Sequence, residues 1–181
     1  MAACLQHTVL YVQVPSTLII IASLDALMEI HTAIVIDAPA FSVWNMLTDL
    51  ASYPRWNPFI TRIKGELKQG GRLDLDIKLE KTIAFDPVVL DVQLERQISW
   101  LDKSTGSLFM AEHRLEIQTL AHDRVTFFQI ASFTGPIVSL VEKKLETCFR
   151  KGLEEMNAAL KKVAEQSWLG STGQPVLAGK N

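Results

Sequence analysis

The residue of this sequence best suited to moving a proton or to hydrogen-bonding a ligand is His113. It lies in residues 109–118, where apolar and polar side chains alternate, and it shares the apolar face with Phe109, Leu115 and Ile117. A partly buried imidazole on such a face can act as an acid, a base or a hydrogen-bond donor. A lone inward histidine is more often a structural residue, bonded to the backbone or to a nearby Asn or Gln. The sequence leaves both interpretations open and favours the structural one.

Other candidates for contact with a small molecule are polar or aromatic side chains outside that strand. Gln129 alternates with Phe127 and Phe133, which predicts an inward direction for its amide. Trp56, Asn57 and Trp100 combine aromatic bodies with polar tips, a combination that suits the mouth of a cavity for an amphipathic ligand. Trp56 fits equally well as a residue that locks a short helix onto a sheet.

Several kinds of chemistry lack their usual machinery in this chain. Asp74, Asp76 and Glu80 have the two-residue spacing of an outward strand face, which favours a solvated surface over a metal site. Nucleophile elbows, phosphate-binding loops and zinc-binding helices have local signatures that do not occur here. Cys4 and Cys148 lie far apart without ligand spacing, so we expect reduced cysteines, although a disulfide between them is possible. We therefore expect no metal and no cofactor.

The charge pattern disfavours a nucleic-acid partner. Eighteen Lys and Arg are set against twenty Asp and Glu, and the basic residues are interleaved with acids, as in residues 142–146 and 150–155. Binding to phosphate backbones depends on clustered basic charge. A hydrophobic fraction of 48% in 181 residues instead indicates one folded domain of ordinary composition.

The first part of the domain is expected to contain a strand and short helices. Residues 31–36 are rich in β-branched side chains, and Asp37 is a suitable N-cap for a helix with Pro39 in its first turn. An apolar stripe runs along this helix, which must end before Pro54. The prolines after Tyr53 and Asn57 predict extended backbone at both of those residues.

The rest of the domain is expected to be antiparallel strands followed by one long helix. Gly70-Gly71 predicts a hairpin turn between strands at about 60–68 and 72–80, and alternation predicts further strands at 88–95, 98–100, 109–118 and 124–133. The stretch 137–165 has the apolar stripe of a long amphipathic helix. The fold class is therefore α+β. A twisted sheet of six to seven antiparallel strands would wrap around the long C-terminal helix and leave an internal hydrophobic cavity.

The ends of the chain differ in composition from this domain. We interpret residues 1–29 as an apolar N-terminal extension, residues 30–166 as the folded domain and residues 167–181 as a flexible tail. Residues 8–24 are strongly apolar but match neither a secretory signal nor a membrane span well. A translation start at Met28, a signal and an anchor all stay open. The expected location is the cytoplasm, with membrane association or export as the alternative if residues 1–27 are present.

The domain carries a series of short motifs in a characteristic order. They are Ile36-Asp37-Ala38-Pro39 with Val43-Trp44, Tyr53-Pro54-Arg55-Trp56-Asn57-Pro58, Glu112-His113, Phe133-Thr134-Gly135, and Gly152-Leu153 with Met156-Asn157. With these motifs the segment from about Ile30 to Glu165 resembles the START-like, or SRPBCC, superfamily with its helix-grip fold, in particular the polyketide cyclase/dehydrase branch. The resemblance implies a cavity for a lipid-like or polyketide-like molecule between the sheet and the long helix. Where the family often has an acidic residue, this chain has Ala131.

Two functions follow from the resemblance. The favoured one is a binding or transport module without enzymatic activity, whose partner is a hydrophobic or amphipathic small molecule. The alternative is a polyketide cyclase or dehydratase in which His113 moves protons. The residues expected to contact the ligand are Trp56, Asn57, Leu75, Ile77, Val92, Trp100, His113, Gln129, Phe149 and Met156.

Overall fold

The computed structural model describes residues 27–103 and 106–171 of the chain. Residues 8–24, Cys4 and residues 172–181 lie outside the described residues, and with them the expectations about an anchor, a disulfide and most of the tail. The described elements, in chain order, are β1 (Leu27–Ile36), α1 (Ala40–Thr48), η1 (Leu50–Ser52), α2 (Tyr53–Trp56), β2 (Ile60–Gly65), β3 (Leu73–Lys78), β4 (Thr82–Phe85), β5 (Val88–Gln93), β6 (Gln97–Asp102), η2 (Gly106–Leu108), β7 (Met110–Ala121), β8 (Arg124–Thr134) and α3 (Val138–Ser171).

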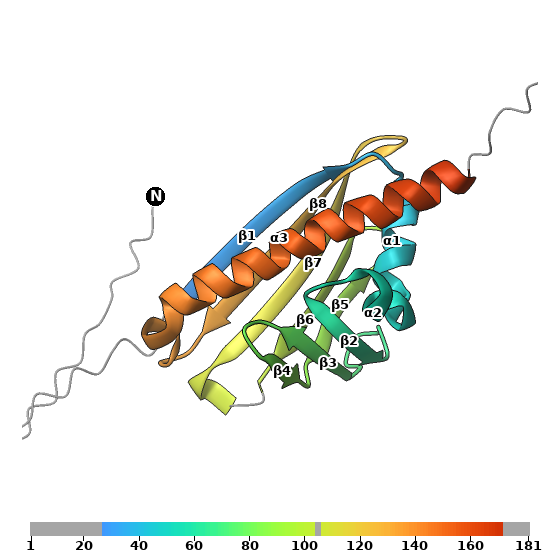
Figure 1. Cartoon of the computed structure of the whole chain (residues 1–181). Helices are drawn as coiled ribbons and strands as arrows, with labels where there is room; N and C mark the ends of the chain where they lie inside the picture. The colour runs from blue at the N-terminus through green and yellow to red at the C-terminus, as the bar shows by residue number, and fades with distance from the viewer. Residues whose placement is uncertain (1–26, 104–105, 172–181) are drawn as a thin grey trace, which may run out of the picture.

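The strands form two antiparallel sheets, and α3 lies along them (Figure 1). The larger sheet has the order β1-β8-β7-β6-β5, and the smaller one has the order β2-β3-β4. The sheets meet at the turn after β2, where the backbone N–H of Gly70 donates to Val89 O and that of Val89 donates to Gly71 O. Gly70 has a φ of +76°, a conformation that favours glycine in such a turn.

The α+β class and the helix-grip arrangement are confirmed, but the described strands number eight in two sheets and not six to seven in one. The strand that the sequence did not indicate is β4. Its burial pattern is almost entirely exposed, so it has no alternation between an inner and an outer face that a periodicity argument could detect.

The short helices differ from the prediction at two positions. The N-cap of α1 is Pro39 and not Asp37, whose carboxylate instead forms an ion pair with Arg124. Tyr53 has helical backbone, because Pro54 fits the first turn of α2 where its missing N–H costs no intrahelical bond. Asn57 is extended, as expected.

The long helix α3 spans 34 residues and supplies much of the core. Its inward stripe contains Phe149, Leu153, Met156, Leu160 and Ala164, which are buried against the sheet. The helix continues six residues past Glu165, the expected end. Trp168 in this added part packs edge-on against Phe41 of α1, with ring centroids 5.8 Å apart. Within residues 27–103 and 106–171, no helix has both the length and the apolarity needed to cross a membrane.

Candidate functional site

A small cavity lies in the core between the two sheets and α3. Its volume is about 30 Å³. The described residues that line it are Leu75, Ile77, Phe85, Pro87, Trp100, Asp102, Ala111, Glu112, His113, Ala131, Phe133 and Phe149. A cavity needs roughly 10–15 Å³ to hold one water molecule, so this space in its present form is far smaller than a lipid or an aromatic metabolite.

His113 reaches the cavity from β7 and is the first member of a chain of buried polar side chains. Its Nε2 lies 3.1 Å from Oε1 of Gln129 on β8. The amide nitrogen of Gln129 donates to Leu153 O (2.9 Å) and to Oδ1 of Asn157 (2.7 Å), both on α3. Asn157 in turn donates from Nδ2 to Thr32 Oγ1 on β1, at 3.1 Å. The chain therefore links three strands to the helix through the core.

The hydrogen bonds of Gln129 determine which nitrogen of His113 carries the proton. The carbonyl of Leu153 can only accept, so the amide NH₂ of Gln129 must face α3 and its oxygen must face His113. That oxygen is also only an acceptor, and therefore Nε2 of His113 is the protonated nitrogen. In the neutral ring Nδ1 is then an acceptor. No described residue forms a hydrogen bond with it.

Burial keeps this ring neutral. His113 is 8% exposed, and loss of solvation lowers its pKa from 6.5 to about 4, with the hydrogen bond to Gln129 acting in the opposite direction. Its ring packs edge-on against Trp100 at 5.1 Å. The hydrogen bond between Nε2 and Gln129 is the contact with a neighbouring amide that the structural interpretation of His113 predicts. The same ring also lines the cavity.

The structure brings about half of the other predicted ligand residues to the cavity. Leu75, Ile77, Trp100 and Phe149 line it together with His113. Gln129 is fully buried and reaches the site through His113.

The remaining predicted residues lie outside the lining. Asn57 has a structural task, because its Oδ1 accepts from the backbone N–H groups of Phe59 and Ile60. Trp56 donates to Ser52 Oγ, so it helps to fix the short helices. Met156 is a fully buried core residue, and Val92 packs at the edge of the core.

Sequence reasoning missed two members of the polar chain. Asn157 follows the stripe positions Leu153 and Met156 on the inward side of α3, and Thr32 lies between Ile30 and Ile34 on the inward face of β1. A polar residue within an apolar stripe is a detectable signal. It does not, however, show which other side chain it will meet across the core.

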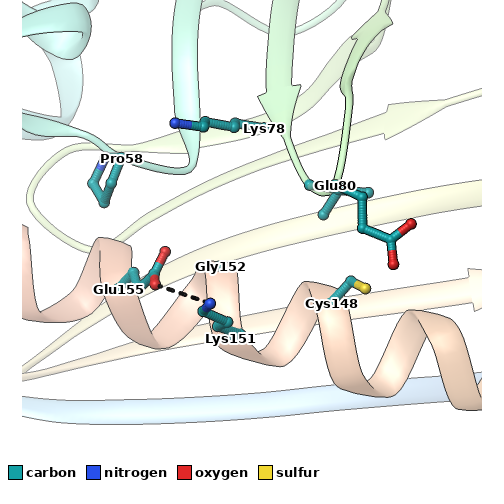
Figure 2. A pocket seen from close by; sticks show the side chains of 8 residues that line it. Pro58, Lys78, Glu80, Cys148, Lys151, Gly152 and Glu155 are labelled. Carbon is teal, nitrogen blue, oxygen red and sulfur yellow. Dashed lines mark ion pairs between the residues drawn. The ribbon is translucent and has the colours of Figure 1, made fainter.

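A second hollow, of about 390 Å³, opens beside the cavity between the end of β3 and α3 (Figure 2). Its described lining is Pro58, Lys78, Leu79, Glu80, Cys148, Lys151, Gly152 and Glu155. We call this hollow the outer cleft. Phe149 lines the inner cavity, and its helix neighbours Cys148 and Gly152 line the outer cleft.

The acidic residues of β3 form a surface network with a basic partner. Arg62 on β2 bonds to both Asp74 and Asp76, and these contacts lower the pKa of each carboxyl group. In the part of the chain that the structure describes, no group of three or more His, Cys, Asp or Glu side chains is placed to hold a metal ion.

Solved structures with similar folds include enzymes and a protein named only by its superfamily. The Zhui aromatase/cyclase from Streptomyces sp. R1128 is 17% identical with a TM-score of 0.70, covering 82% of this chain and 100% of that one. A START superfamily protein from Mycobacterium smegmatis is 22% identical with a TM-score of 0.61, covering 77% and 98%. Norcoclaurine synthase from Thalictrum flavum, in complex with dopamine and hydroxybenzaldehyde, is 14% identical with a TM-score of 0.60, covering 86% and 96%.

These identities are low and establish the fold alone. A search of curated proteins found no match. The family model described as "Polyketide cyclase / dehydrase and lipid transport" matches residues 28–165, a range that runs from β1 through most of α3 and includes the whole polar chain. Because this range spans well over half of the sequence, the chain belongs to the polyketide cyclase / dehydrase and lipid transport family.

Proposed function

We propose that this protein binds a hydrophobic or amphipathic small molecule, of lipid-like or polyketide-like character, between its sheets and α3, and that it does so as a binding or transport module without catalysis. The observation that carries the proposal is the inner cavity. Its walls are mostly apolar, and one buried imidazole within them is held in a fixed orientation by Gln129. A ligand site typically combines such apolar walls with a few well-placed polar groups.

The ligand needs more room than the cavity offers at rest, and the outer cleft supplies a route. Phe149 lies next in the helix to residues of the outer cleft and itself lines the cavity, with its ring centroid 4.9 Å from that of Phe133 and 5.5 Å from that of Phe59. Above it, the exposed ion pair between Glu80 and Lys144 links the turn after β3 to α3. Exposed ion pairs contribute only about 0–1 kcal/mol, so this link does not prevent the cleft from widening.

The basicity of His113 favours binding over catalysis. A general base works best when its pKa lies near the working pH. Burial holds the pKa of His113 near 4, which makes the imidazole a weak base at neutral pH. Ala131 lies opposite His113 in the β7–β8 register, so the cross-strand position adds no carboxylate that would strengthen this base.

The proposal is tested by native mass spectrometry of the full chain, with thermal unfolding in the presence of a panel of lipids and aromatic compounds. We expect a one-to-one adduct and a raised Tm with part of the panel. Ala131→Leu fills the cavity and should abolish both effects, whereas Ala33→Leu, on the exposed face of β1, should leave both intact. Failure of every compound to bind or to stabilise the wild-type chain would contradict the proposal.

A second candidate function is a cyclase or dehydratase, and it rests on Nδ1 of His113, which is unprotonated in the neutral ring and can accept a proton as a general base does. If this function is correct, His113→Gln should lose turnover of a polyketide-like substrate while ligand affinity is kept. Loss of affinity alone, with no turnover by the wild type, would leave the binding function.

A further inference from the structure

The lining of the inner cavity includes side chains with hydrogen-bond acceptors. Among the described residues of its lining, the ionisable side chains are those of Asp102, Glu112 and His113. Asp102 pairs with Ala111 on the same side of the sheet, and its Oδ2 accepts from the backbone N–H of Asp86, whereas Glu112 alternates with Ala111 and His113 along β7 and its side chain therefore points to the other face. His113 also lines the cavity, and the ring nitrogen that it has left for a ligand is Nδ1, because its side-chain N–H is used in the bond to Gln129.

Contacts outside the cavity determine which ring nitrogen of His113 carries the proton. If the ring of His113 were to donate from Nδ1, Nε2 would lose its proton and would face the oxygen of Gln129, an acceptor facing an acceptor. Turning the amide of Gln129 would remove that clash but would place its oxygen against Leu153 O, which lies 2.9 Å from the amide nitrogen now. The carbonyl of Leu153 therefore fixes the tautomer of His113 through the two hydrogen bonds of Gln129 that connect them.

We infer that the ligand presents a hydroxyl group, a phenol or an alcohol, on an apolar body, and that this hydroxyl donates its hydrogen bond to Nδ1 of His113. The inference rests on the proposed binding function and names the chemical class of its ligand. A hydroxyl suits the site because it is a neutral donor, so it enters an apolar cavity without the desolvation cost of a charge.

Two other polar groups fit the site less well. A carboxylate would place a negative charge near the acid Asp102, in a cavity whose described lining contains neither lysine nor arginine. A ketone can only accept, so it would face Nδ1 without a hydrogen between them. Both groups would leave at least one polar atom without a partner in the core, which is unfavourable in a dry environment.

The test uses three probes that share one apolar body: 1-naphthol, 1-methylnaphthalene and 1-naphthoate. Each is titrated into the full chain by calorimetry. One net hydrogen bond corresponds to roughly fivefold to tenfold in affinity, so 1-naphthol should bind that much more tightly than 1-methylnaphthalene, and 1-naphthoate should bind most weakly. In His113→Phe the ratio of the first two affinities should fall to about one. In His122→Phe, an exposed histidine between β7 and β8, the ratio should stay at the wild-type value.

The outcomes separate the two claims. If 1-methylnaphthalene binds as tightly as 1-naphthol, or if 1-naphthoate binds best, the hydroxyl inference is wrong while the binding function stands. If none of the three probes binds the wild-type chain, the proposed binding function itself is in question. Binding of 1-methylnaphthalene to His113→Phe shows that the variant is folded, and the comparison within the wild type needs no variant at all.

Discussion

The polar chain from His113 to Thr32 runs through a core that is otherwise apolar. Gln129 is its central residue, because it accepts from the imidazole on one side and donates twice to α3 on the other. Buried polar groups are stable only when their hydrogen bonds are made, so each member of the chain depends on the others. Two consequences of this dependence can be measured at single residues.

The first concerns the pH dependence of stability. The pKa of His113 is about 4 in the folded protein against an ordinary value of 6.5, so the unfolded chain takes up this proton more readily. The neutral, buried His113 therefore contributes its full share to the free energy of unfolding above about pH 6.5. This share is lost as the pH falls toward 4, and the loss reaches roughly 2–3 kcal/mol by pH 4.5. Urea unfolding at pH 7.5 and pH 4.5 should show this loss in the wild type. His113→Gln should lose less, and an equal loss in both proteins would contradict the assignment.

The second concerns Gln129. Gln129→Met keeps the volume but leaves the Nε2 hydrogen of His113 and Oδ1 of Asn157 without partners, which should lower the free energy of unfolding by about 2–5 kcal/mol. Gln93→Met, at an exposed side chain, should change it by less than about 0.5 kcal/mol. Both free energies of unfolding are measured by chemical denaturation. Equal effects of the two substitutions would show that the buried hydrogen bonds of Gln129 contribute no more to stability than an exposed side chain does.

Among the elements, α3 packs closely against the segment that precedes β2. Gly152 allows the helix to approach Phe59, because a Cβ at this position would lie 2.1 Å from the buried phenyl ring.

Basic side chains of the same helix also bond to the open edge of β1, where Arg150 donates to His31 O and Lys161 donates to Val35 O. Cations placed on a sheet edge discourage its pairing with another chain.

The close approach at Gly152 predicts opposite effects of one substitution at two helix positions. Gly152→Ala should destabilise the fold by about 1–3 kcal/mol, since the overpacking of Phe59 outweighs the gain in helix propensity. Gly170→Ala, with open space around it in the same helix, should stabilise by up to about 1 kcal/mol. Thermal unfolding of both variants measures the difference. A stabilised Gly152→Ala would mean that the helix does not depend on this contact.

At the scale of the whole molecule, the inner cavity and the outer cleft are two spaces against α3, where Phe149 lines the first and its neighbours Cys148 and Gly152 line the second. The cavity contains the imidazole of His113, and the outer cleft is the larger of the two spaces. If a ligand passes from the cleft to the cavity, the rate of its entry depends on how readily the ring of Phe149 moves aside.

Shortening this side chain should therefore speed association. Phe149→Leu should raise the association rate of 1-methylnaphthalene measured by stopped flow, at a cost of about 1–2 kcal/mol in stability. Phe41→Leu, at a half-exposed ring on α1, is the matched control and should leave the rate unchanged. An unaltered rate in Phe149→Leu would place the ligand's route elsewhere.

The sequence was sufficient for features that follow from local periodicity. The alternation around His113 predicted its inward direction, and the stripe of 137–165 predicted α3, whose side chains then define the cavity. Features that depend on contacts across the core were not predictable in the same way. Asn57 was expected at a cavity mouth, but its short-range bonds to Phe59 and Ile60 use it in a turn. Asn157 and Thr32 meet across 125 positions of sequence, which no spacing rule reveals.

The central claim is that His113 is the polar contact of a site for hydrophobic molecules, with Nδ1 as its acceptor. The most direct measurement is nitrogen NMR of the His113 imidazole in the full chain, before and after saturation with 1-naphthol. We predict an unprotonated Nδ1 in the free protein, whose resonance shifts on addition of 1-naphthol and shifts far less with 1-methylnaphthalene. A protonated Nδ1 in the free protein, or a His113 signal that stays unchanged while the probe is bound, would contradict the account.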